Sequence, residues 1–220
     1  MSTTQHTEPD THEMVLVHRV FRREFRLLPE LIRRVGEGDT ARAAVLAEHA
    51  TDLVMGLHHH HVAEDDLLWP ALLRQAKVHT DLVHRMEAQH TDLSAILDQV
   101  EELMPVWAAK AGFAERDQLV DALDKVSKIL DFHLAEEEQK ILPLVRKYLT
   151  VNQWKALGAH GAEAIDDKQK RLMFLGMILE DTSTDEERNF LSQMPAPVRV
   201  LWKVLGRRQY AAYMASIRTS

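Results

Sequence analysis

The chain has 220 residues, of which 45% are apolar and 28% are charged, and its formal net charge is −7. It contains no cysteine, which excludes disulfides, iron-sulfur clusters, thiolate nucleophiles and sulfur-ligated zinc, so any metal must be held by imidazole and carboxylate groups. The negative charge argues against a nucleic-acid-binding protein, which normally carries a basic footprint. Thirteen histidines are the unusual feature of the composition.

The N-terminal residues are polar, and the longest apolar run, at residues 172–179, is far shorter than a membrane span. We therefore expect no membrane span and a cytoplasmic location.

Apolar residues recur at steps of three and four along most of the chain, which is the pattern of amphipathic helices. We predict an all-α fold in which Gly36, Gly38 and Gly112 mark breaks between helices. The four long helices are expected at residues 11–35, 41–76, 80–110 and 115–149. Short links between long helices favour an up-down four-helix bundle.

Beyond residue 149 the expected helices are shorter, at residues 153–162, 168–180, 185–193 and 198–217. We therefore divide the chain into a metal-binding bundle at residues 11–149 and a C-terminal helical extension at residues 150–220, packed on the bundle. Residues 198–220 contain five basic side chains and no acid. Such a helix could meet nucleic acid, an anionic membrane surface or a partner. We favour the alternative in which its apolar side packs on the bundle and its basic side meets the chain's own carboxylates.

The two halves of the predicted bundle repeat each other. Three residues of the second helix recur 73 residues later in the fourth: His60, Glu64 and Pro70 against His133, Glu137 and Pro143. Three residues of the first helix recur 72 residues later in the third: His12, Met14 and His18 against His84, Met86 and His90. Repetition at a fixed displacement indicates a duplicated helical hairpin.

The repeated residues point to a metal site in the bundle core. Residues four apart lie one turn apart on the same helix face, so each His-x-x-x-Glu pair can hold one ion or bridge two. Both pairs interrupt apolar stripes, formed by Leu53, Leu57 and Leu67 in the second helix and by Val126, Leu130 and Ile141 in the fourth. Metal ions would remove the cost of burying the carboxylates. The ligand types are those of di-iron and di-manganese bundles, and we expect two non-haem iron ions, with manganese or zinc as alternatives.

These motifs resemble the hemerythrin-like, or HHE cation-binding, family. That family has a lone histidine on helix one, His-x-x-x-Glu on helix two, a histidine on helix three and His-x-x-x-Glu on helix four. The resemblance covers residues 11–149 and implies metal ligands at His18, His60, Glu64, His90, His133 and Glu137. Glu138 is a weaker candidate, because oxygen-carrying members use a spacing of five in helix four.

One departure from the oxygen-carrying members bears on function. They have His-x-x-x-His on helix three, whereas the first of these positions is Met86 here. His61 is a weaker candidate for the missing ligand, since some members place an extra ligand directly after the helix-two histidine. With a ligand fewer, the irons should offer an open position to dioxygen, nitric oxide or peroxide, which favours reactivity over reversible carriage.

We therefore predict a non-haem di-iron protein that reacts with small oxidants, for example by catalase-like peroxide decomposition in oxidative stress. The alternative is a module that stores iron or senses iron, oxygen or nitric oxide without turnover. The sequence leaves the substrate and the oligomeric state open. We assign no function to His58 and His59, and we expect three further histidines to be structural or exposed: His12, His84 and His160.

Overall fold

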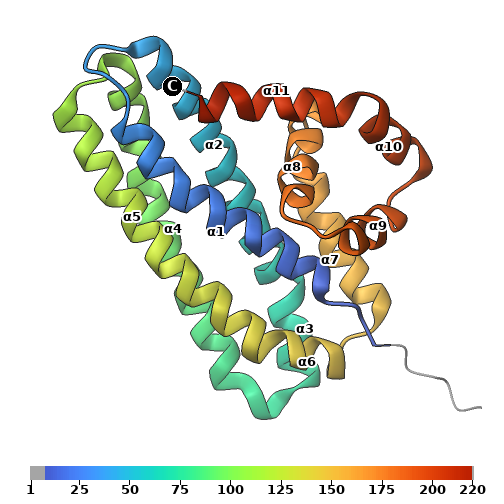
Figure 1. The fold of residues 1–220 in the computed structure, drawn as a ribbon. Coiled ribbons are helices and arrows are strands. Elements are labelled where there is room, and N and C mark those ends of the chain that lie inside the picture. The colour runs from blue at the N-terminus through green and yellow to red at the C-terminus, as the bar shows by residue number, and fades with distance from the viewer. Residues whose placement is uncertain (1–7, 220) are drawn as a thin grey trace, which may run out of the picture.

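The computed structural model describes residues 8–219, which Figure 1 shows as helices joined by short links. No strand occurs within these residues, so the predicted all-α class is confirmed. In the same part of the chain, no helix combines the length and the apolar character that crossing a membrane requires.

Four long helices build the bundle: α1 (His12–Arg33), α2 (Thr40–Ala63), α4 (Thr80–Lys110) and α5 (Phe113–Glu136). α1 and α4 each pack against both α2 and α5, so the four helices form a closed ring (Figure 1). Asp39 caps α2 by accepting a hydrogen bond from the Arg42 amide at 3.0 Å, and Ala111 ends α4 in the left-handed region at φ 48°. These local breaks keep the links short, as an up-down bundle requires.

Two π-helical turns interrupt the second and fourth predicted helices at matching positions. η1 (Glu64–Leu68) leads into α3 (Trp69–Gln75), and η3 (Glu137–Ile141) leads into α6 (Leu142–Tyr148). Because a π turn holds more residues than an α turn, it shifts every later residue to a different face. The prediction that Leu67 faces the core was therefore wrong: its side chain is 37% exposed, and Leu68 takes the inner position at 1%.

The C-terminal helices lie on the side of the bundle that α1 and α2 form (Figure 1). The 3₁₀ turn η2 (Lys77–His79) joins α3 to α4. The extension consists of α7 (Val151–Glu163), α8 (Lys168–Glu180), α9 (Thr184–Ser192), α10 (Ala196–Leu201), the π turn η4 (Trp202–Gly206) and α11 (Arg207–Arg218). α7 and α11 contact α2, and α8 contacts α1 and α11.

Polar contacts fasten the end of the extension to the bundle. The Arg218 guanidinium donates a hydrogen bond of 3.1 Å to Glu24 of α1 and another of 2.9 Å to Glu180 of α8. The Tyr213 hydroxyl lies 2.7 Å from Nδ1 of His49, a buried histidine of α2. The C-terminal basic residue thus meets carboxylates of its own chain.

Candidate metal centre

Five histidines and two glutamates from the four bundle helices meet at one level of the core. α1 contributes His18, α2 contributes His60 and His61, α4 contributes His90, and α5 contributes His133. Each π turn begins with one of the glutamates, Glu64 or Glu137. The side chains of His18, Glu64 and Glu137 are fully buried, and even His60, the most exposed of the seven, has a side chain only 10% exposed. Ionisable groups so deeply buried need partners.

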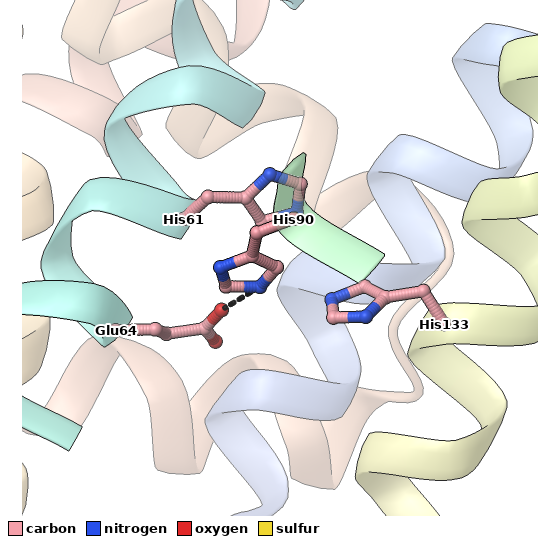
Figure 2. Close-up of side chains that lie close together, drawn as sticks. All are labelled: His61, Glu64, His90 and His133. Carbon is pink, nitrogen blue, oxygen red and sulfur yellow. Dashed lines mark ion pairs between the residues drawn. The ribbon is translucent and has the colours of Figure 1, made fainter. Parts of the chain in front are cut away.

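The seven side chains form two groups that share one carboxylate. In each group, one ligand atom per residue lies within 4.8 Å of all the others. The first group, shown in Figure 2, consists of His61, Glu64, His90 and His133. The second consists of His18, His60, Glu64 and Glu137. Only Glu64 belongs to both, so its carboxylate joins the two groups.

The atoms that point into the centre have no hydrogen-bond partner. Among residues 8–219, the unpaired buried atoms include Nε2 of all five histidines and both oxygens of each glutamate. The nearest approaches are 3.3 Å from His18 Nε2 to Glu137, and 3.4 Å to Glu64 from Nε2 of both His60 and His90. Buried polar atoms are nearly always satisfied, and nitrogen and oxygen donors that converge without partners suit cations. The residues present therefore fit bound metal cations.

In three of the histidines, the second ring nitrogen, Nδ1, has a hydrogen-bonding partner outside the ligand groups. Nδ1 lies close to an acceptor oxygen in each case: Glu138 at 2.9 Å from His18, Asp65 at 2.7 Å from His90, and Gln89 at 2.9 Å from His133. A histidine that donates through Nδ1 presents the lone pair of Nε2 inward, which is the arrangement that outer partners impose on metal ligands.

The structure places Glu138 outside both groups. Its carboxylate binds the outer nitrogen of His18 and accepts a hydrogen bond of 2.6 Å from Arg22. Asp65 stands 73 residues before Glu138 and occupies the equivalent place at His90. Sequence reasoning did not single out Asp65 or Gln89, although extending the 73-residue repeat by one position would have found Asp65.

The pKa values of the candidate histidines are shifted in two opposite directions. Burial lowers the pKa of His60 to about 3 and that of His133 to about 4, so both imidazoles are neutral and free to bind a metal. Burial alone would also lower the pKa of His18, but Glu137 and Glu138 raise it to about 9. Burial, together with the charge of Glu137, raises the pKa of Glu64. Bound cations would take the place of the protons that these groups otherwise attract.

The other histidines singled out from the sequence lie elsewhere. His12 is half-exposed and contacts Glu186 at 2.7 Å, while His84 contacts Glu87 at 2.7 Å on the surface. His58 is exposed, His59 is partly exposed and His160 is exposed. Met86 is fully buried and belongs to neither ligand group.

The core of this four-helix bundle brings together histidine and glutamate side chains whose inward-facing atoms have no hydrogen-bond partner in the part of the chain that the structure describes. These features define the class of cation-binding helical bundles. The family model described as the hemerythrin HHE cation binding domain matches residues 10–145. The chain therefore belongs to the hemerythrin HHE family, which confirms the resemblance seen in its motifs. Comparisons with curated proteins and with solved structures gave no significant match.

Proposed function

We propose that this protein binds two non-haem iron ions and reacts with a small oxidant, with hydrogen peroxide as the first candidate. The position of Glu64 carries this proposal, because it is the one residue common to the two ligand groups. A carboxylate shared between two histidine-rich groups supports two neighbouring ions rather than one. Manganese and zinc are the alternatives that the same ligands accept.

The ligand count supports a reactive centre. Each group offers four residues, including the shared Glu64, whereas non-haem iron commonly takes more ligands than four. His61 adds to the first group a nitrogen donor that Met86 does not offer. An ion held by four residues would still have room for a small molecule. When bound, a pair of iron ions would supply the electrons for reducing an oxidant.

The chain itself would orient the ligands and exclude water. The candidate ligands lie between two apolar clusters, one containing Phe21 and Phe25 and the other containing Met14, Met86 and Trp69. The Phe21 ring lies 5.4 Å from that of His60. Glu138, Asp65 and Gln89 hold the imidazoles in place from outside. These contacts favour admission of a small uncharged molecule over bulk solvent.

The first test is metal content and turnover of protein expressed without a histidine tag. We expect about two irons per chain by elemental analysis, an optical band that responds to peroxide, and catalytic peroxide consumption. Zinc alone, or metal that dialysis removes, would refute the redox function.

Sensing is the second candidate, because the extension is attached close to the centre. Arg218 binds Glu24, which lies six residues after the candidate ligand His18 on α1. A change at the metal centre that moved α1 would therefore reach the C-terminal helix. A sensor should bind dioxygen or nitric oxide stoichiometrically and change shape without consuming peroxide. Protease sensitivity of the extension with and without ligand would distinguish the two functions.

A further inference from the structure

A buried tryptophan is connected to the candidate metal centre through a single carboxylate. Trp69 is fully buried at the start of α3, and its indole Nε1 donates a hydrogen bond of 2.8 Å to Oδ1 of Asp65. The same oxygen lies 2.7 Å from Nδ1 of His90. The ring centroids of Trp69 and His90 are 5.6 Å apart. Indole, carboxylate and imidazole thus form an unbroken chain to the first ligand group.

The other half of the repeat lacks this chain. Glu138 corresponds to Asp65, but its second partner is the Arg22 guanidinium at 2.6 Å, and the position equivalent to Trp69 is Leu142. An arginine neutralises the carboxylate and cannot be oxidised. Among residues 8–219, no lysine or arginine forms an ion pair with Asp65. Only the His90 side therefore combines an oxidisable ring with a carboxylate free to accept its proton.

We propose that Trp69 is a one-electron donor to the metal centre, with Asp65 as the acceptor of the indole proton. The inference rests on the proposed reaction with peroxide. Reducing one hydrogen peroxide to two waters takes two electrons and two protons. When the irons hold only one reducing equivalent, Trp69 supplies the second electron.

Oxidation of Trp69 releases the indole proton and leaves a radical, and the surroundings provide a route for each. The N–H proton passes along the existing hydrogen bond to Asp65, whose side chain is 47% exposed and can release it to solvent, and a neutral indolyl radical remains. The peroxide takes both of its protons from solvent water, and the indole proton that Asp65 releases replaces one of them. A soluble one-electron reductant such as ascorbate restores the indole. Without one the radical adds dioxygen, and one electron from a ferrous ion of an unreacted chain and one proton from water complete a tryptophan hydroperoxide.

Trp107 supplies a control inside the same chain. It is fully buried like Trp69, and its Nε1 has no hydrogen-bond partner within residues 8–219. It stands seventeen positions after His90 on α4, which corresponds to about 25 Å along the helix. Oxidant that diffuses through the protein would treat the two buried rings alike, whereas electron transfer to the centre would select Trp69.

The test uses iron-loaded protein that has been brought to one reducing equivalent per chain, and treats it with limiting peroxide in air without further reductant. Peroxide consumption, a freeze-quenched radical signal and oxygenated tryptophans in peptide maps are measured on the same sample. We expect Trp69 to be oxygenated at least tenfold more than Trp107 in the loaded protein, and neither in the metal-free protein. Trp69→Phe should abolish the radical signal at unchanged iron content, and Trp107→Phe should leave it unchanged.

Asp65→Asn keeps the indole but removes the proton acceptor. At saturating iron it should reduce oxygenation of Trp69 at least tenfold. Peroxide consumption with equal oxidation of Trp69 and Trp107, or a radical that persists in Trp69→Phe, would overturn the role of Trp69 and leave the peroxide function standing. A loaded protein that consumes no peroxide would overturn both.

Discussion

Glu64 and Glu137 are equivalent in the sequence repeat but not in the structure, so replacing them one at a time tests the two-ion arrangement. Glu137 belongs only to the second ligand group, whereas Glu64 belongs to both. Glu137→Gln should therefore lower the iron content from about two ions per chain to about one, because the first group keeps all four residues. Glu64→Gln removes a carboxylate from both groups and should lower the content to well below one.

The metal-free variants provide the second half of the prediction. Burial and the charge of Glu137 raise the pKa of Glu64, and neither oxygen of Glu64 has a hydrogen-bond partner in the described residues. Glutamine keeps the volume and removes the charge, so metal-free Glu64→Gln should unfold at a temperature equal to or above that of the metal-free native chain. Added iron should stabilise the native chain and not this variant.

The assay is elemental analysis after chelation, reloading with excess iron and desalting, combined with thermal unfolding. A third variant, Glu138→Gln, should still bind two ions at saturation, but about 10–100-fold more weakly, because Glu138 only orients His18 from outside. The double variant His58→Ala, His59→Ala should keep the native iron content. Equal loss of ions from the two glutamate variants, or any loss from the double variant, would refute the two-ion arrangement.

Two further predictions concern the docking of the extension. Burial opposes the ionisation of Glu24, whereas His49 and Arg23 favour it. The net effect lowers the pKa of Glu24 from 4.5 to about 2. The stability this gives is complete above pH 4.5 and disappears as the pH falls through 2, so Glu24→Gln should lower the free energy of unfolding by on the order of 3 kcal/mol at pH 7 and by little at pH 2. Urea titrations at both pH values measure this, and an equal loss at both would contradict it. Gly176→Ala would place a Cβ against the Tyr210 ring and should lower the free energy of unfolding by about 1–3 kcal/mol. A Cβ at Gly158 would have no atom within 4 Å, so Gly158→Ala should raise the free energy of unfolding by about 0.5–1 kcal/mol. Thermal unfolding compares the two, and a Gly176→Ala chain as stable as the native one would show that the α8–α11 contact is not rigid.

The sequence by itself determined the class of fold and the kinds of group in the centre. Helical periodicity and glycines at the breaks indicate a helical bundle, and the absence of cysteine limits the candidate metal donors to imidazole and carboxylate. The 73-residue repeat selected the two His-x-x-x-Glu pairs, because a pattern that recurs at one displacement in an inward phase is hard to explain as a surface feature. Periodicity and residue type are local properties of each segment, and the repeat needs only a comparison of two segments of the sequence.

Only the tertiary structure decided how the donors are shared. His60 and His61 are neighbours about 100° apart on one helix, yet both have Nε2 buried in the centre, and they belong to different ligand groups. The π turns at Glu64 and Glu137 change the helical phase at the site itself, so a constant period misplaced Leu67. The contacts of Asp65 with His90 and of Glu138 with His18 join residues 25 and 120 positions apart in the chain. Which histidine meets which carboxylate depends on the rotation and stagger of four packed helices, and those are set by the whole core rather than by any one segment.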